Sequence, residues 1–344
     1  MLRSRVRFIL IYLVVLAAIL SAVVFVQIRT FTRLFQVRLT DIVAPISPQT
    51  LTDGAVTFLL LGIGGTGHEG PTLTDSITLV RYSPIDGSVH TLGIPRDLWN
   101  PEIQDKVNAT YTYALQQNKV TPTQYVKAKY SDLLKVQIDH VMIINFADFE
   151  ELIDLIGGVD VLIEKGFVDT QYPKDGFADV ECEPYDPNYG CRYETLVFRA
   201  GLQKLSGKVA LKYVRSRHAD GEEGSDFSRS SRQQNVLTSI RNRIEELVRR
   251  RDFDTLTIVA SFLNNRIKRD ISNKESIALA RSLLLRSNKV RLTTQTLPES
   301  AFEVPPLTQY DGRYVLVPKD DDFAQFQSLI HSKLNVQMKP DRSE

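Results

Sequence analysis

The chain has 344 residues, of which 43% are hydrophobic and 24% are charged. This balance excludes a disordered, collagen-like or coiled-coil protein. Its 42 lysines and arginines nearly cancel its 41 aspartates and glutamates, so no overall field attracts nucleic acid and any anion site must be local. The two cysteines and five histidines lack the spacing of a zinc site, so a bound metal would have oxygen ligands.

An apolar segment near the N-terminus is long enough to cross a bilayer. Residues 8–26 carry no charge, and as a helix they would span about 28 Å, close to the thickness of the hydrocarbon core. No small-residue cleavage site follows, which favours an uncleaved anchor over a signal peptide or a buried core helix. We therefore predict a single-pass cell-membrane protein with a cytoplasmic tail (1–7), a transmembrane helix (8–26) and an extracytoplasmic remainder.

Strand-like and helical patterns alternate after a juxtamembrane helix and linker over residues 27–54. The predicted strands are Val56–Ile63, Ile77–Arg81, Val89–Ile94, His140–Asn145, Val159–Ile163, Val290–Leu297 and Tyr314–Val317. The predicted helices are Ala109–Gln117, Pro122–Val136, Ala147–Ile156, Ser206–Val214, Ser228–Arg251, Asp254–Ile267, Lys274–Leu285 and Asp321–Leu334. This order predicts an α/β fold with a central mixed β-sheet and helices on both faces.

Residues 165–200 are rich in turn-forming residues and are predicted to form a loop. This segment holds both cysteines of the chain, Cys182 and Cys191. Because the predicted topology places them outside the cytoplasm, where thiols oxidise, we expect them to form a disulfide that staples the loop. Its role would be structural.

Side chains with several rigid hydrogen-bond donors gather in a few segments at strand and helix ends. They are Arg96, Arg215, Arg217, Arg229, Arg232 and Gln233. Guanidinium forks bind phosphate oxygens bidentately, and Arg229 and Gln233 share one face near the positive end of a predicted helix, so we predict a pyrophosphate site. The alternative is a solvated helix face paired with Glu222, Glu223 and Asp226, which we prefer for the arginines at 241, 243 and 249–251.

Asp75 follows a loop and opens a predicted strand, where its carboxylate either binds a hard cation or caps the turn. Magnesium takes one or two carboxylates and completes its shell with water and substrate phosphate, so one acid beside an arginine cluster is sufficient. Three other kinds of site are excluded. No helix is predicted to follow the glycines at 62–67, which argues against a dinucleotide-binding Rossmann site. The chain contains neither the GK[ST] of a P-loop nor the GxSxG of a serine hydrolase.

Six segments occur in an order that is specific to one family. They are LLLGIG, LTDS, IPRDLW, KVNATY, INFADFEELIDLIGGVDV and KYVRSRH followed by DFSRSSRQQ. In this order they resemble the LytR-CpsA-Psr (LCP) family of membrane-anchored cell-wall glycopolymer transferases. The resemblance implies an LCP-like catalytic domain over residues 55–250, and we expect residues 251–344 to form an α/β extension packed on that domain.

The resemblance also implies roles for the charged residues. By motif position, Arg96, Arg215, Arg217, Arg229 and Gln233 match pyrophosphate-binding residues, with Arg232 beside them. Asp75 matches a ligand of Mg²⁺, and we expect Arg96, Arg217 and Asp75 to be catalytic. Asp97 is expected to orient Arg96 rather than to act as the base.

One position departs from the family pattern. Members commonly have a second aspartate just after the first strand, where this chain has Gly64. Either Glu69 supplies the missing carboxylate or the metal is held by Asp75 alone and more weakly.

The implied reaction transfers a glycopolymer from a polyprenyl (undecaprenyl-type) pyrophosphate carrier to a sugar hydroxyl of peptidoglycan. It forms a phosphodiester and releases polyprenyl phosphate, with catalysis that is mainly electrostatic. Two alternatives remain open at this stage. The protein could be a non-catalytic envelope regulator that binds lipid-linked pyrophosphates, or a pyrophosphatase that uses water in place of the sugar hydroxyl.

Overall fold

The computed structural model describes residues 53–336 except 69, 118–119, 175, 178–179, 184–185, 220 and 287–289, together with isolated positions between 29 and 51. The predicted tail and transmembrane helix and Glu69 therefore lie outside the described residues. Within the part of the chain that is described, no helix combines the length and apolar character needed to cross a membrane.

The chain divides into two compact units. In the described part of the smaller one, the segment Ser272–Arg281 contacts residues near position 40: Arg281 Nη2 donates to the Ala44 carbonyl at 2.6 Å, and Lys274 pairs with Asp41 at 3.6 Å. The larger unit, Ser47–Ile271 with Ser282–Glu344, contains the sheet and both cavities discussed below.

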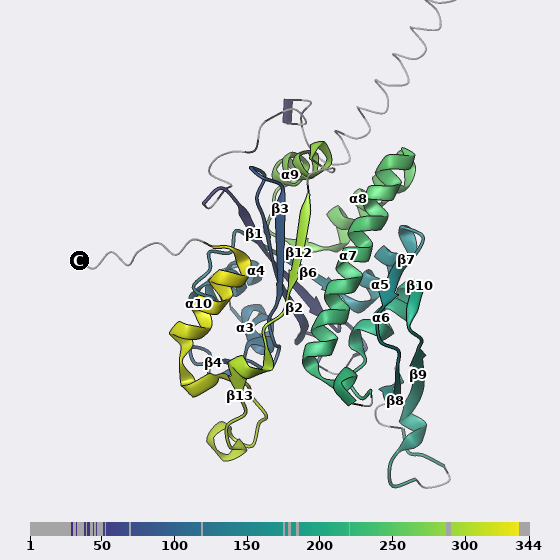
Figure 1. Ribbon diagram of the computed structural model, residues 1–344, viewed down its shortest axis with the longest axis vertical. Helices are drawn as coiled ribbons and strands as arrows, with labels where there is room; N and C mark the ends of the chain where they lie inside the picture. Colours follow the sequence, from purple (N-terminus) through teal and green to yellow (C-terminus); the bar gives the residue numbers. More distant parts are fainter. Residues whose placement is uncertain are drawn as a thin grey trace, which may run out of the picture. The chain divides into compact units, whose positions relative to one another are not determined.

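Six strands of the described chain form one mixed sheet, in the order β11-β6-β1-β2-β3-β12 (Figure 1). They are β1 (Val56–Ile63), β2 (Thr74–Tyr82), β3 (Ser88–Gly93), β6 (His140–Asn145), β11 (Lys268–Arg269) and β12 (Arg291–Gln295). β1 pairs antiparallel with β2 and parallel with β6, and β12 pairs parallel with β3. The predicted central mixed sheet is confirmed.

The remaining strands form two-stranded ribbons, and the α-helices follow the predicted order. The ribbon strands are β4 (Trp99–Asn100), β5 (Asp105–Lys106), β7 (Val159–Ile163), β8 (Phe167–Pro173), β9 (Tyr193–Phe198), β10 (Gly201–Leu205), β13 (Phe302–Glu303) and β14 (Val317–Pro318). The helices are α3 (Thr110–Leu115), α4 (Pro122–Leu134), α5 (Phe146–Leu155), α6 (Gly207–Arg215), α7 (Asp226–Arg250), α8 (Phe253–Arg266), α9 (Asn273–Leu285) and α10 (Phe323–Leu334).

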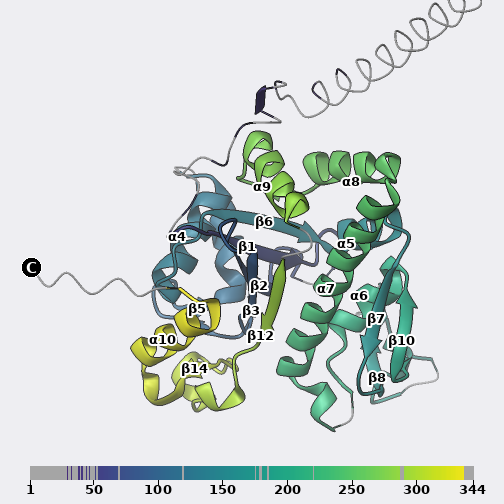
Figure 2. The ribbon, with the colours of Figure 1, turned by 45° about the horizontal axis from the view of Figure 1, so that its top comes forward.

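Because side chains alternate along each strand, the two faces of the sheet contact different helices. On one face, Leu59 and Leu61 of β1 and Ile77 of β2 are almost completely buried in a core with α3, α4 and α10. Full burial of each such side chain contributes roughly 1.5–3 kcal/mol. The opposite face is covered by α5, α6, α7 and α8, and the two groups of helices lie on either side of the sheet in Figures 1 and 2.

A second apolar cluster lies beyond the helices on that opposite face. It joins α5, α6, α7 and α8 to β7, β8, β9 and β10 through residues such as Ile153, Phe167 and Tyr213. The backbones of α5 and α6 approach each other closely at Gly207. A Cβ at this position would lie 2.1 Å from the Glu150 carbonyl oxygen of α5 and would prevent the approach. Glycine is therefore required there, and α6 presents its C-terminal arginine from a fixed position.

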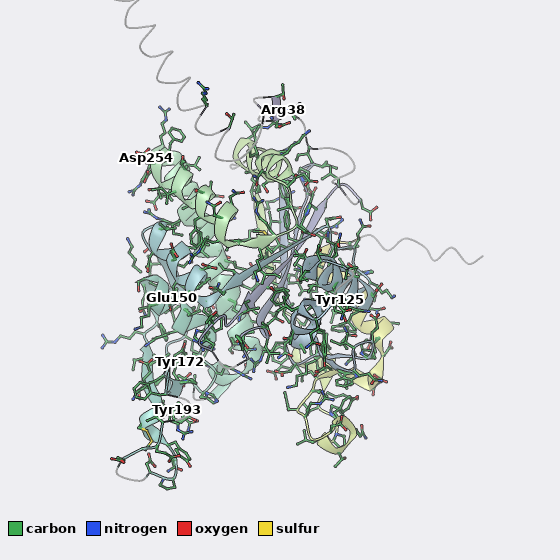
Figure 3. The ribbon with its side chains drawn as sticks, turned by 180° about the vertical axis from the view of Figure 1, so that it is seen from behind. Arg38, Tyr125, Glu150, Tyr172, Tyr193 and Asp254 are labelled. Atoms are coloured by element: carbon green, nitrogen blue, oxygen red, sulfur yellow. A yellow bond between two sulfur atoms is a disulfide. The ribbon has the colours of Figure 1, made fainter. Side chains whose placement is uncertain are left out.

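The loop predicted over residues 165–200 is wrong in part. β8 and β9 pair antiparallel within it, and Figure 3 shows Tyr172 and Tyr193 on these strands. The turn-forming residues that suggested a loop lie between the strands, where Cys182 and Cys191 form a disulfide. Inward residues of β8 alternate with exposed ones, and this short pattern was hidden by the turn-rich sequence that follows it.

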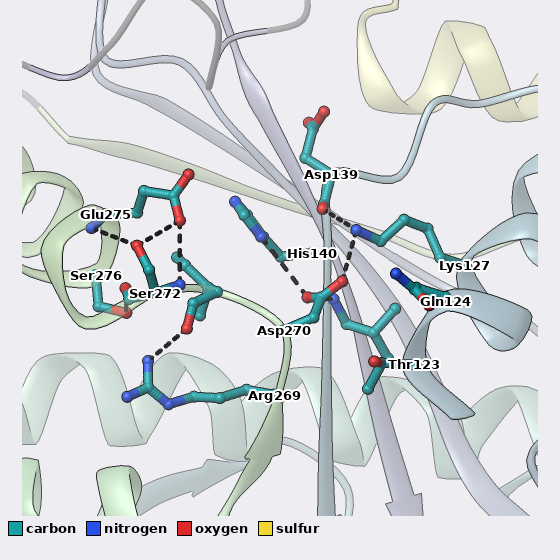
Figure 4. Close-up of polar contacts among 12 residues, drawn as sticks. Thr123, Gln124, Lys127, Asp139, His140, Arg269, Asp270, Ser272, Glu275 and Ser276 are labelled. Carbon is teal, nitrogen blue, oxygen red and sulfur yellow. Dashed lines mark hydrogen bonds and ion pairs between the residues drawn. The ribbon is translucent and has the colours of Figure 1, made fainter. Parts of the chain in front are cut away.

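Asp270, next to the edge strand β11, ties three elements together (Figure 4). Its carboxylate accepts a hydrogen bond from the Val141 amide at 2.7 Å, pairs with Lys127 Nζ of α4 at 2.5 Å and lies 3.6 Å from His140 Nδ1. Burial raises the pKa of Asp270, but the hydrogen bonds from its neighbours outweigh burial and lower that pKa from 3.8 to about 2.

This shift predicts acid sensitivity. A carboxyl whose pKa is lower in the folded protein stabilises the fold above pH 3.8, and that contribution is lost as the pH falls through 2. Asp270→Asn should reduce the free energy of unfolding by roughly 1–3 kcal/mol at pH 6 and flatten its decline between pH 4 and pH 2, measured by urea unfolding. Asp311→Asn, whose side chain is 90% exposed, is the control. An unchanged pH profile for Asp270→Asn would contradict the assignment.

Candidate functional site

A large cavity of about 410 Å³ lies on the sheet face covered by α5, α6, α7 and α8. Its floor consists of alternate residues from β1, β2 and β6, namely Leu60, Gly62, Ser76, Thr78, Met142 and Ile144. Because these strands are in register, with Leu60 opposite both Thr78 and Met142, their side chains point to the same face.

The helices supply an almost entirely apolar roof to the large cavity. It is formed by Phe146, Phe149, Leu152, Leu211, Val214, Val236, Leu237, Ile240 and Leu263. Aliphatic and aromatic walls of this kind remove hydrocarbon from water and offer few partners to polar groups. The cavity is therefore suited to an apolar chain.

One end of the large cavity is charged. Six of the predicted site residues line it together: Asp75, Arg96, Arg215, Arg217, Arg229 and Gln233. Asp75 is the second residue of β2, and Arg96 lies in the segment after β3. Arg215 ends α6 and Arg217 follows it, while Arg229 and Gln233 lie in the first turns of α7. The fold thus brings together donors that are far apart in sequence, and they meet where the apolar lining ends.

Arg96 is held by two carboxylates. Its Nη1 donates to Asp75 Oδ1, and its Nε lies 3.4 Å from Asp97 Oδ2. Burial raises the pKa of Asp97, but a hydrogen bond from Lys106 and the positive charges of Arg96 and Arg217 outweigh burial and hold that pKa below its usual value. Asp97 therefore remains ionised and orients Arg96, as a positioning residue would.

Two other predicted donors are fixed by local contacts. The Arg215 guanidinium lies 4.3 Å from the centre of the Phe146 ring and 5.6 Å from that of Tyr172, within the range of cation–π attraction. The Gln233 side-chain oxygen accepts a hydrogen bond from Ser76 Oγ at 3.0 Å, so its amide group faces a defined direction.

Arg232 does not join the other predicted pyrophosphate-binding residues, because it lies outside the cavity lining. Its guanidinium donates to the carbonyls of Tyr213 at 3.1 Å, Glu223 at 2.9 Å and Ser216 at 2.5 Å, and its side chain is 3% exposed. We correct the prediction accordingly. Arg232 instead fastens the segment that carries Arg217.

Asp169 of β8 was missed by the sequence reasoning. It is fully buried, and its Oδ2 accepts hydrogen bonds from Ser216 Oγ at 2.6 Å and from the amides of Arg217 and His218 at 3.2 Å each. Burial raises its pKa, but the hydrogen bond from Ser216 Oγ and those from backbone amides outweigh burial and keep the pKa below its usual value. The charged carboxylate thus holds the turn that presents Arg217. The sequence did carry one signal for this role: Asp169 lies on the same buried side of a short alternating segment as Phe167 and Tyr172.

The residues present fit a metal ion only if a ligand shares it. Asp75 faces the cavity beside the arginines, so it could hold Mg²⁺ jointly with phosphate oxygens. The described residues do not form a preformed metal cage, because they contain no cluster of three or more His, Cys, Asp or Glu side chains. At position 64, a Cβ would lie 2.9 Å from His68 Cβ, so His68 fills the space of a second acid.

The arrangement of these motifs matches one protein family along most of the chain. The sequence profile of the LytR_cpsA_psr family matches residues 36–331. The chain belongs to the LytR_cpsA_psr family. The order of sequence motifs had suggested the same assignment, which is therefore confirmed.

Several known members of the LytR_cpsA_psr family are similar to this chain. The polyisoprenyl-teichoic acid–peptidoglycan teichoic acid transferase TagT of Bacillus subtilis is 28% identical over 225 residues, covering 64% of this chain and 62% of TagT. TagU of Bacillus cereus, a transferase of the same description, is 27% identical over 189 residues, or 54% of this chain and 51% of TagU. The chain thus spans about half to three-fifths of the length of these relatives. The crystal structure of B. subtilis TagV has the same fold, with a TM-score of 0.56, 19% identity and coverage of 84% and 100% of the two chains.

The role of Asp169 can be tested by anion binding. Asp169→Asn removes the charge that holds the Arg217 turn, so affinity for inorganic pyrophosphate should fall about tenfold, the equivalent of about 1.4 kcal/mol. Isothermal calorimetry would measure the change, with Asp160→Asn on the exposed face of β7 as the control. A folded Asp169→Asn protein with unchanged affinity would refute the positioning role.

Proposed function

We propose that the protein transfers a glycopolymer from a polyprenyl pyrophosphate carrier to a peptidoglycan sugar hydroxyl. The observation that carries this proposal is the meeting of Asp75 and five multi-donor side chains at one end of an apolar cavity. A lipid-linked pyrophosphate has the same two parts, a hydrocarbon chain and a compact anion. The names of TagT and TagU, which describe a polyisoprenyl-linked donor and a peptidoglycan acceptor, support the same substrate classes.

The protein's own residues would act by position and charge. With the lipid in the large cavity, the pyrophosphate meets Arg96, Arg215 and Arg217, whose forks can replace its water shell. Negative charge grows on the bridging oxygen as the bond between the phosphates breaks, and donors already in place lower the barrier because they need no reorganisation. Arg229 is 6% exposed and acts from a site that water screens little.

We further propose that Mg²⁺ assists the reaction, bound by Asp75 together with substrate phosphate oxygens. When bound there, it would supply Lewis-acid stabilisation of the phosphoryl oxygens. We also propose that residues 8–26 anchor the protein in the cell membrane with the catalytic domain outside, which would give it access to the wall. An undecaprenyl-type chain is the carrier we expect.

The arginines provide the direct test of the transfer function. Arg217→Ala should lower glycan transfer by at least ~10²-fold, as expected for the loss of one preorganised donor, and Arg217→Lys should recover only part because an ammonium group cannot form the bidentate contact. The assay uses a polyprenyl pyrophosphate-linked glycan and soluble peptidoglycan fragments. Arg250→Ala, whose side chain is 68% exposed, serves as the control and should retain activity.

Different outcomes separate the alternatives. Release of lipid phosphate without a glycan–peptidoglycan product would favour a pyrophosphatase. Binding of the carrier without turnover would favour a regulator. Full transfer activity in Arg217→Ala would contradict the proposed site.

The metal proposal has its own test. Asp75→Asn should raise the Mg²⁺ concentration needed for half-maximal transfer about tenfold, because a neutral amide is a weaker ligand for a hard cation. Titration of Mg²⁺ into chelator-treated protein measures this, with Asp160→Asn as the control. Transfer that persists unchanged in excess chelator would contradict a metal role while leaving the transfer function standing.

A further inference from the structure

A second, small cavity of about 20 Å³ meets the same charged residues. It is lined by Asp75, Ile77, Gly93, Ile94, Pro95, Arg96, Phe227, Arg229, Ser230, Gln233, Thr296 and Leu297. Four of these residues, Asp75, Arg96, Arg229 and Gln233, also line the large cavity. The charged group is therefore a wall shared by two cavities.

The two cavities approach that wall from opposite sides along the sheet. The large cavity lies over β1, β2 and β6, whereas the small one lies at the ends of β2, β3 and β12, beside the start of α7. Because β2 lies between β1 and β3 in the sheet, Asp75 near its start borders both cavities.

The start of α7 separates the cavities. A Cβ at Gly93 would lie 2.1 Å from Ser230 Oγ, so the helix passes very close to the end of β3. On the helix, Val236 and Ile240 face the large cavity and Phe227 and Ser230 face the small one, while Arg229 reaches both. A ligand group in either cavity is thus within reach of the same guanidinium.

We infer that the small cavity receives the acceptor hydroxyl of the transfer reaction; this inference rests on the proposed function. Displacement at phosphorus places the attacking and leaving oxygens roughly in line. If the lipid phosphate leaves toward the large apolar cavity, the attacking oxygen must arrive from the other side of the phosphorus. The small cavity borders the same donors from the side away from the large cavity.

The chemical step balances without an added reactant. The acceptor oxygen forms a bond to the phosphorus that carries the glycan, and the bond from that phosphorus to the bridging oxygen breaks with its electron pair. The lipid monophosphate departs, and the proton of the acceptor hydroxyl ends on this phosphate. Arg96 and Arg229 border both positions and can neutralise charge on either side of the phosphorus.

The size of the small cavity agrees with this role. About 20 Å³ accommodates one water-sized group, so a hydroxyl enters while the sugar ring that bears it stays outside. Thr296, directly after β12, is a half-buried lining residue that the large cavity does not share. It comes from the part of the chain beyond residue 250, to which the family motifs gave no role.

Thr296 allows the two cavities to be tested separately. Thr296→Phe should fill the small cavity, raising the acceptor KM for soluble peptidoglycan fragments at least tenfold while leaving the affinity for the polyprenyl pyrophosphate glycan within twofold. Thr296→Met, which adds less bulk, should give a smaller change in the same direction and serves if the phenylalanine variant does not fold. Thr293→Phe, at an exposed position of β12, is the matched control and should behave like the wild type.

Two results would overturn the inference. One is wild-type transfer kinetics in both Thr296 variants, and the other is a parallel loss of donor affinity, which would assign the small cavity to the donor. A wild-type protein that binds the donor yet forms no transfer product would instead overturn the proposed function, and this inference with it. This failure of the proposed function can be told apart from a failure of the inference, because it is observed in the wild-type protein without any variant.

Discussion

Four arginines meet at one end of an apolar cavity, and their mutual repulsion must be offset before any ligand arrives. The protein meets this constraint with carboxylates and aromatic rings. Asp97, 4% exposed, lies beside Arg96, and Asp169, fully buried, holds the turn of Arg217. Arg215 lies over the Phe146 ring. Because these partners are buried, the donors are held in position before a ligand arrives, as electrostatic catalysis of the proposed transfer would require.

The carboxylates that stabilise the arginines also explain why distant segments must fold together. Asp169 belongs to β8, whose ribbon partner is β9, and it reaches the turn after α6. Arg232 of α7 donates to the carbonyls of Tyr213, before that turn, and Glu223, after it. The segment 216–218 is thus held by both Asp169 and Arg232. The β8–β9 ribbon, which is separate from the central sheet, is therefore required for the geometry of the site.

The sequence patterns that located most of the fold were long and apolar. β1, β6 and β7 agree with their predicted bounds because each is a continuous or alternating apolar run. β8 was missed because its alternation is short and borders a turn-rich segment. The predicted site shows the same division. The motifs singled out Arg96 and Arg229, which line the charged end of the cavity. The three carbonyls that hold Arg232 and the hydrogen bonds of Asp169 depend on tertiary contacts that no local pattern encodes.

The proposed acceptor role of the small cavity raises the question of why water would not compete with the sugar hydroxyl. Space alone cannot discriminate, because a cavity of about 20 Å³ admits water as readily as a sugar hydroxyl. Selectivity must therefore come from the remainder of the acceptor, bound outside the cavity, where its binding energy can be used to position the hydroxyl. A hydroxyl that is held in the reactive orientation has a high effective concentration. A freely rotating water molecule adopts that orientation only rarely, so it reacts less often. If the small cavity receives the acceptor hydroxyl as proposed, the protein need not exclude water; it would need a surface beside Thr296 that holds the acceptor in register with the charged wall.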